Sequence, residues 1–116
     1  MMEDLQKEAQ EKIQELQQIE QNLNNFGSQR QNFQMQLIEL ENALKEVALV
    51  PTAYRIIGNV MVSSPREDIV ADLTSKKEVA ELRIRTIERQ EEKLREKASQ
   101  IQKEVLASMK GGQNGE

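Results

Sequence analysis

The sequence has 116 residues, enough for one domain, of which 31% are charged and only 3% are aromatic. It contains no cysteine and no histidine, which excludes disulfides, thiolate or imidazole metal sites, and catalysis by a thiol or an imidazole. The net charge of −4 gives no general attraction to nucleic acid or to an anionic membrane.

The composition favours long helices that bury a narrow seam over a conventional globular core, because Glu, Gln, Lys, Arg and Leu dominate. The first ten residues, MMEDLQKEAQ, are acidic and lack the apolar run of a signal peptide. No apolar stretch approaches membrane-spanning length. We therefore expect a soluble, cytoplasmic protein that uses no cofactor and binds neither membrane nor nucleic acid.

Residues 1–49 follow a strict heptad pattern. Twelve of fourteen positions reached by alternating steps of three and four residues are apolar, where chance would give about five. The pattern predicts one coiled-coil helix, with a soft point at Gly27 that does not shift the phase. The seam positions are Met2, Leu5, Ala9, Lys12, Leu16, Ile19, Leu23, Phe26, Arg30, Phe33, Leu37, Leu40, Leu44 and Val47.

Residues 50–64 are predicted to form a linker and a β-hairpin. Pro51 ends the first helix, because proline disfavours helical geometry in its predecessor and cannot donate a helix hydrogen bond. Two β-branched runs then flank Gly58-Asn59, a two-residue loop typical of type I′ or II′ turns. The predicted pairs are Ile57 with Val60, Ile56 with Met61, Arg55 with Val62, and Tyr54 with Ser63.

A second coiled-coil helix is predicted over residues 65–110. Ser64 and Glu67 form an S-x-x-E capping box around Pro65, which would occupy the first helical position. Gly111-Gly112 predicts the helix end, and residues 111–116 are expected to be a disordered tail. The seam positions are Val70, Leu73, Lys77, Ala80, Ile84, Ile87, Glu91, Leu94, Ala98, Ile101, Val105 and Ser108, and Val79, Leu82, Leu106 and Met109 widen the stripe.

The expected fold is therefore mainly α with a small β element: a long antiparallel coiled-coil hairpin with one central β-hairpin. Residues whose numbers sum to roughly 114 should lie opposite each other. An isolated two-stranded hairpin is marginal in water, and this one has two open edges and largely apolar side chains on both faces. We expect it to be an oligomerisation module; the alternative is a hairpin folded over its own helix ends.

The hairpin segment YRIIGNVMV (54–62) resembles that of prefoldin β-class subunits, most of all the archaeal form, and RTIERQEEKL (85–94) is similar to a stretch of their second helix. A single hairpin distinguishes this class from the α class, which has two. The resemblance covers nearly the whole chain. The positions that match the family's assembly hairpin are Tyr54, Ile56, Ile57, Gly58, Val60 and Val62.

The resemblance implies an ATP-independent chaperone, a holdase, whose hairpins assemble into an inter-subunit β-barrel. Its partners would be a prefoldin α-type subunit, in a hexamer of two α and four β chains, and a group II chaperonin that receives the unfolded polypeptide. The chain could also form a homo-oligomer alone. Unfolded client proteins would be captured at the tips of the coiled coil.

The antiparallel fold would bring the two termini together as such a tip. Methionine suits promiscuous apolar contacts because it is flexible and polarisable. Each of these residues also fits an ordinary coiled-coil seam, so only the tip as a region indicates binding. The candidate client-binding residues are Leu5, Ala9, Ile13, Leu16, Ile101, Val105, Leu106 and Met109.

An enzyme is not expected. IIGNV lacks the spacing and lysine of a phosphate-binding loop, and the acidic pairs lie on helix surfaces with no predicted pocket. Lys12 and Arg30, at seam positions, are expected to specify the register or to tolerate a splayed coil. The competing hypothesis is a non-chaperone coiled-coil scaffold or tether, which would have no use for a hairpin with open edges.

Overall fold

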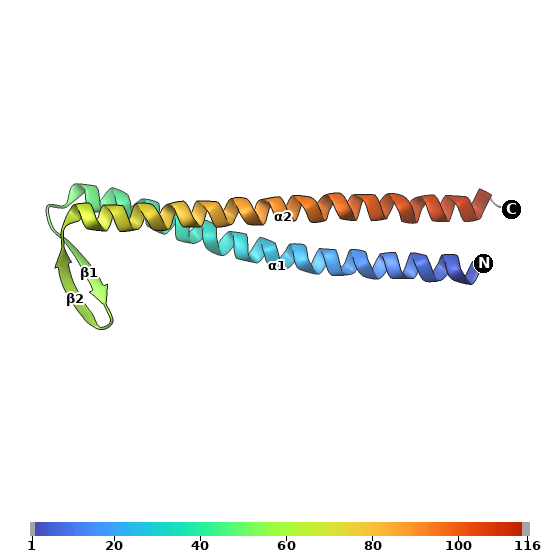
Figure 1. Ribbon diagram of the computed structural model, residues 1–116, viewed down its shortest axis with the longest axis horizontal. Helices are drawn as coiled ribbons and strands as arrows, with labels where there is room; N and C mark the ends of the chain where they lie inside the picture. Colours follow the sequence, from blue (N-terminus) through green and yellow to red (C-terminus); the bar gives the residue numbers. More distant parts are fainter. Residues whose placement is uncertain (1, 115–116) are drawn as a thin grey trace. The chain divides into compact units, whose positions relative to one another are not determined.

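The computed structural model describes residues 2–114 and contains two helices with a β-hairpin between them (Figure 1). Helix α1 (Met2–Leu49) is followed by strands β1 (Ala53–Ile57) and β2 (Val60–Ser64) and by helix α2 (Arg66–Asn114). This confirms a mainly α fold with one small β element. The chain divides into two compact units: the hairpin unit, residues 30–86, and the terminal unit, residues 2–29 with 87–114.

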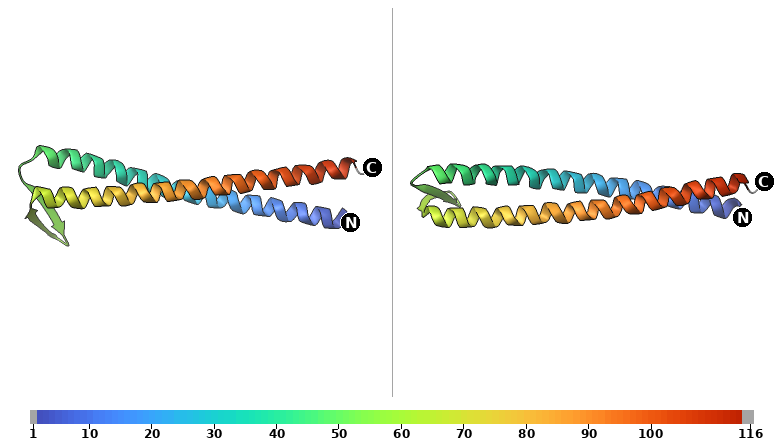
Figure 2. Two further views of the ribbon diagram at one scale, coloured as in Figure 1. Left: turned by 45° about the horizontal axis from the view of Figure 1, so that its top comes forward. Right: turned by 90° about the horizontal axis from the view of Figure 1, so that it is seen from above.

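In the hairpin unit, the last part of α1 and the first part of α2 run antiparallel, side by side, and β1 and β2 project from their junction (Figures 1 and 2). All of this unit's predicted seam positions are at least half-buried, and Ala80 and Ile84 are buried. The Arg83 guanidinium lies 5.5 Å from the centre of the Phe33 ring, two residues from position 81, which the predicted sum of roughly 114 places opposite Phe33.

In the terminal unit, the same seam pattern forms the core. Ile19, Ile87 and Ile101 are buried, and so is Glu91, whose carboxylate forms an ion pair with Arg95 one turn away, at 3.4 Å. From Ala9 inward every predicted seam position is at least half-buried, whereas Leu5 remains 48% exposed. Burial in this unit therefore weakens toward the helix ends.

Arg66, the first residue of α2, also completes the end of α1. Its guanidinium donates hydrogen bonds to the backbone carbonyls of Ala48 and Val50, at 3.5 and 3.3 Å. The Ala48 carbonyl, in the last turn of α1, has no partner within that helix, and the Val50 carbonyl follows the helix end; α1 has no basic residue in its last turn. The cation therefore comes from the next helix instead, and ties the two ends together beneath the hairpin.

The beginning of α2 differs from the prediction by one residue. The Pro65 carbonyl accepts hydrogen bonds from the amides of Asp68 and Ile69, at 3.1 and 3.2 Å, so the helix begins at Arg66. Ser64 is instead the last residue of β2, where it pairs with Ala53. Because the Pro65 carbonyl accepts the first helical hydrogen bond, Pro65 is at the N-cap position and Ser64 lies one residue before the position predicted for it.

The end of α2 also differs. The helix continues past Lys110 to Asn114, so residues 111–114 of the expected tail are helical, and residues 115–116 lie outside the described residues. A glycine within a helix costs about 1 kcal/mol relative to alanine but keeps its amide and carbonyl, so helical hydrogen bonding can pass through Gly111 and Gly112.

The hairpin has the predicted register: Ile57 pairs with Val60, and the pairing runs out to Ala53 with Ser64. Gly58 has a φ of +61°, and it is the only described residue with a positive φ. Of the two turn types expected from the sequence, only type II′ has a positive φ at its first central residue alone. The turn is therefore of the II′ kind, which requires glycine at this position.

Gly27 and Gly58 provide a matched test of these backbone assignments, because a Cβ added at either residue meets no atom within 4 Å. Gly27→Ala should stabilise the protein by about 1 kcal/mol, since alanine is the better helix former. Gly58→Ala should destabilise the hairpin by roughly 1–2 kcal/mol, since the left-handed conformation strains a side chain. Urea unfolding followed by circular dichroism, at one fixed protein concentration, measures both. Equal effects of the two substitutions would contradict the assignments.

Candidate functional site

The hairpin exposes apolar side chains on both of its faces. Tyr54, Ile56 and Met61 share one face and are each more than 60% exposed. The other face presents Ile57 and Val60 with similar exposure, beside Val62 at 37%. Only Ala53, at the base of β1, is buried, so the hairpin is anchored at its base but uncovered along its length.

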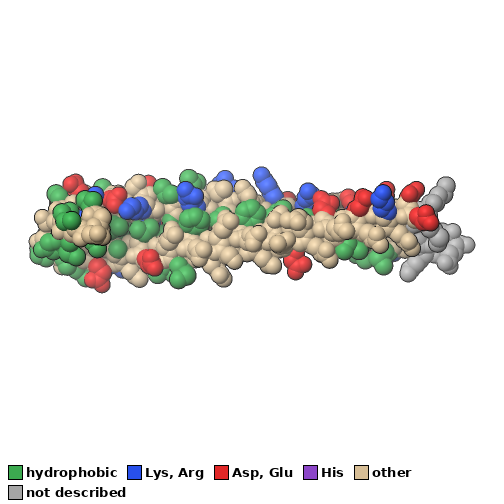
Figure 3. All heavy atoms as spheres, turned by 90° about the horizontal axis from the view of Figure 1, so that it is seen from below, with side chains coloured by type: hydrophobic (Ala, Val, Ile, Leu, Met, Phe, Trp, Pro, Cys, Tyr) green, Lys and Arg blue, Asp and Glu red, His purple; other side chains and the backbone are tan. Residues whose placement is uncertain are grey.

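The strands also leave their outer edges unpaired. The sheet has two strands, and each pairs with the other alone, so each presents a row of backbone amides and carbonyls without a strand partner. In the space-filling view, hydrophobic side chains gather at the end of the molecule where the hairpin lies (Figure 3). Two apolar faces and two open edges are features that favour strand pairing and side-chain contacts with other chains.

The predicted assembly residues all lie on this uncovered surface or at its turn. Tyr54, Ile56, Ile57, Val60 and Val62 are exposed, and Gly58 forms the turn. Met61 belongs with them, because it is 65% exposed beside Ile56, although the set based on resemblance omits it. The alternation of strand faces, which pairs it with Ile56, is the signal that identifies it.

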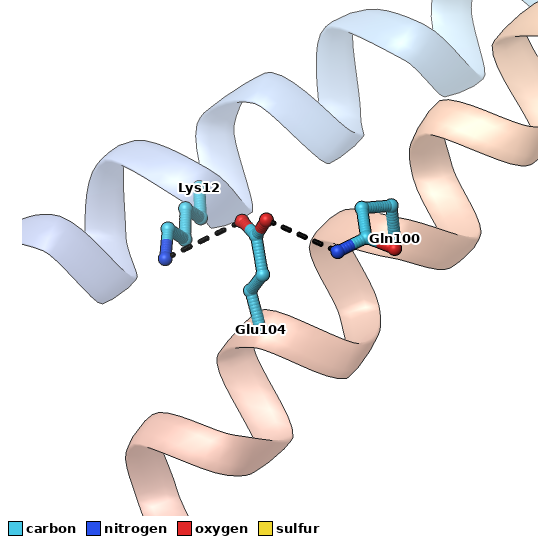
Figure 4. Close-up of polar contacts among 3 residues, drawn as sticks. All are labelled: Lys12, Gln100 and Glu104. Atoms are coloured by element: carbon cyan, nitrogen blue, oxygen red, sulfur yellow. Dashed lines mark hydrogen bonds and ion pairs between the residues drawn. The ribbon is translucent and has the colours of Figure 1, made fainter.

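In the terminal unit, two ion pairs join the helices. The Lys12 ammonium lies 3.5 Å from the Glu104 carboxylate, and the Lys97 ammonium lies 3.2 Å from the Glu15 carboxylate. The Gln100 amide also donates a hydrogen bond to Glu104, at 3.4 Å (Figure 4). The seam lysine predicted to specify register therefore has a carboxylate partner on the opposite helix.

These two ion pairs oppose sliding of the helices in either direction. A slip of one heptad one way would bring Lys12 to the level of Lys97, and a slip the other way would bring Glu15 to the level of Glu104. Each slip replaces an attraction by a repulsion between like charges. The charges therefore favour the observed register at the terminal end.

The eight predicted client-binding residues all lie in the terminal unit, but they divide into two groups. Ile101 is buried and belongs to the core, and Ala9, Leu16 and Val105 are half-buried in the seam. The other four are 45–59% exposed and lie close to the helix ends. The accessible residues are Leu5, Ile13, Leu106 and Met109.

The hairpin unit has one further feature that the sequence did not predict. An open groove of about 510 Å³ runs between α1 and α2, lined by apolar residues that include Phe33, Leu40 and Val79, and by polar ones such as Lys76 and Arg83. Within residues 2–114, no cluster of carboxylates is arranged to hold a metal ion, and neither helix is apolar enough over a sufficient length to cross a membrane.

Comparison with known proteins agrees with this geometry. The sequence profile of the prefoldin-subunit family matches residues 10–112. The chain is 37% identical over 107 residues to the prefoldin subunit beta of Archaeoglobus fulgidus, covering 90% of this chain and 92% of that protein. It is 33% identical over 108 residues to the prefoldin subunit beta of Sulfurisphaera tokodaii, covering 90% and 86%.

A solved structure has the same fold. The crystal structure of the prefoldin beta subunit from Thermococcus strain KS-1 superposes with a TM-score of 0.83 at 30% identity, covering 87% of this chain and 91% of that one. Two helices joined by an uncovered hairpin define the fold of a coiled-coil chaperone subunit. The chain belongs to the prefoldin family, as a member of its beta class, and this family comprises chaperone subunits, not enzymes.

A charge reversal at Lys12 tests whether its ion pair with Glu104 stabilises the terminal unit. Lys12→Glu places a glutamate beside Glu104 and should destabilise the terminal unit by about 0.5–1 kcal/mol, the range of partly exposed ion pairs. The double variant Lys12→Glu/Glu104→Lys should recover most of that loss, as a double-mutant cycle in urea unfolding would show. Additive losses in the double variant, with no recovery, would mean that the pair does not interact.

Proposed function

We propose that this chain is a subunit of an ATP-independent holdase that captures unfolded polypeptides at the paired ends of its helices and passes them to a group II chaperonin. The observation that carries the proposal is the exposure of Leu5, Ile13, Leu106 and Met109 in the terminal unit. Apolar surface of this kind attracts the apolar segments that unfolded chains expose. Several subunits acting together would turn weak individual contacts into useful avidity.

Assembly is the second part of the proposal. The hairpin residues would pair with hairpins of neighbouring subunits and close a β-barrel between them, in a hexamer of two α-type and four β-type chains in the cytoplasm. Support comes from the two open strand edges and from the exposed apolar side chains on both faces. A closed barrel removes the edges, and its interior covers one of the two apolar faces.

Charge on the hairpin tests assembly. Ile57→Asp/Val60→Asp places two carboxylates on one face, and burying them without partners would cost several kcal/mol. The variant should therefore sediment as a dissociated chain, whereas the wild type should form a tetramer or larger particle alone, or a hexamer with an α-type partner.

The matched control for this test is Met35→Asp/Ile38→Asp, which changes two residues of similar exposure on helix α1 and should leave the particle intact. A wild-type chain that is strictly monomeric or dimeric, with or without the partner, would favour a coiled-coil tether over the proposed assembly.

Truncation tests client capture. Deleting residues 1–12 and 104–116 removes Leu5, Leu106 and Met109 but leaves the whole hairpin unit. The particle should keep its size in light scattering and lose its ability to suppress aggregation of guanidinium-denatured citrate synthase. If the truncated particle suppresses aggregation as well as the full chain does, the helix ends are not the capture site and a scaffold function becomes the better account.

A further inference from the structure

The open groove of the hairpin unit lies on the side of the coil from which the hairpin projects. In this unit α2 runs in front of α1, and the hairpin lies below both helices (Figures 1 and 2). Because a right-handed helix turns by about 100° per residue, the residue before each seam position points downward, toward the hairpin's side. The residues that flank the groove all hold such positions: Gln36, Glu39 and Ala43 on α1, and Lys76, Val79 and Arg83 on α2.

The burial of Ile69 supports this placement. Ile69, Lys76 and Arg83 are seven residues apart and therefore lie in one row of α2. Ile69 is not a predicted seam residue, yet it is only 8% exposed, and Ala53 at the hairpin base is 6% exposed. Farther along the same side, Val79 in the groove is 49% exposed. This side of α2 is therefore covered near the hairpin base and uncovered in the groove.

One charge of the groove has no partner. The Lys76 ammonium lies 3.2 Å from the Asp72 carboxylate, and the Arg83 guanidinium lies over the Phe33 ring. Within the part of the chain that the structure describes, Glu39, the third charged residue of the groove, has neither an ion pair nor a hydrogen bond. A segment that fills the groove should therefore be apolar and should bring one cation to this carboxylate.

One face of the hairpin has this chemistry. Arg55 pairs with Val62 in the strand register, and Ile57 pairs with Val60 on the same face. Among the described residues, Arg55 has no ion pair or hydrogen bond either. Ile57 and Val60 are 61% and 59% exposed, so their own coil does not cover them. We call these four residues the arginine face.

The opposite face suits the interior of a barrel. It consists of Tyr54, Ile56, Met61 and Ser63, none of which is charged. Residues 51–64 contain no acidic side chain, so an arginine enclosed by hairpins of this chain would lose its water without gaining a carboxylate. A barrel therefore encloses the uncharged face at the lower cost, and it leaves the arginine face outside, where three apolar side chains still need cover.

We propose that the groove holds the arginine face of the hairpin of a second copy of this chain. The apolar side chains of that face pack against Leu40 and Val79, and the Arg55 guanidinium of the second copy pairs with the Glu39 carboxylate. This inference rests on the proposed assembly. It adds which face of the hairpin is enclosed, and it identifies the surface that covers the other face.

Disulfide cross-linking between two chains tests the contact, because the sequence has no cysteine of its own. A chain carrying Val79→Cys is refolded with an isotopically labelled chain carrying Val60→Cys, with the α-type partner if the particle needs it, and is then oxidised. Mass spectrometry should show disulfide-linked pairs of unlike chains, several-fold more than with Leu82→Cys in place of Val79→Cys. Leu82 is the matched control, because it is 55% exposed on α2 but does not line the groove.

The outcomes separate this contact from the assembly itself. If the wild type forms no particle larger than a dimer, with or without the partner, the proposed assembly fails. If the particle forms but the yields at positions 79 and 82 are equal, or position 82 gives more, the groove is not the site of contact. A chain that carries both Val79→Cys and Val60→Cys should link to other chains. A disulfide within one chain would mean that the hairpin folds onto its own coil, and would overturn the proposal.

Exchange of two charges tests the pairing of Arg55 with Glu39. Glu39→Arg should raise the concentration at which half of the particle dissociates, on the order of tenfold, because two guanidinium groups then face each other. Glu39→Arg/Arg55→Glu should recover most of this loss. Glu78→Arg, at an exposed carboxylate of the same unit outside the groove, should leave dissociation unchanged.

A double variant that dissociates as readily as Glu39→Arg alone would contradict the pairing. Circular dichroism measures the helicity of each variant, and for a variant that loses its helices the cross-linking result decides.

Discussion

The structure depends on a small sheet that the chain cannot complete alone. A hairpin of two five-residue strands has two open edges, and its apolar side chains point to both sides, so no single covering element can bury them. The chain fixes the shape of this hairpin with a glycine at φ +61° and with an anchored Ala53, but it leaves the rest uncovered. In the proposed assembly, neighbouring chains would supply the missing strands and the missing cover.

The two helices bury only the residues of their shared seam. Their seams are buried only as far as two helices can bury them, and the most buried apolar residues, Ile19 and Ala80, are still 4% exposed. Polar groups enter the seam where they have partners, as Lys12 does with Glu104. Toward the helix ends the seam residue Leu5 becomes partly exposed, and Met109, which lies beside the seam, is also exposed. The same pattern therefore provides both a stable coil and an accessible apolar end.

Most of the fold could be predicted from the sequence, because the patterns that determine it involve residues close together in the chain. The Gly58-Asn59 turn determines the hairpin register by itself, and a 3.5-residue period determines which helix positions face the partner. Sequence reasoning missed the bond from Arg66 to Val50, since sixteen residues separate them and no local pattern marks the contact. It also misplaced the beginning of α2 by one residue, because the first helical hydrogen bond is accepted by the Pro65 carbonyl.

The candidate site was less predictable for a physical reason. Ile101 and Leu5 occupy equivalent seam positions in the heptad pattern, yet one is buried and the other is half-exposed. Exposure near a helix end depends on how much of the partner helix remains alongside, which a periodic pattern does not report. The structure was therefore needed to tell which of the candidate client-binding residues are exposed.

The most direct test of the central claim is amide hydrogen exchange in the hairpin, residues 53–64, of the purified protein. Completion of the sheet by neighbouring chains predicts slow exchange throughout both strands at micromolar concentration, including the amides on the outer edges, with protection that is lost on dilution. Exchange in these strands as fast as in an unstructured peptide, in a particle otherwise intact, would contradict the claim.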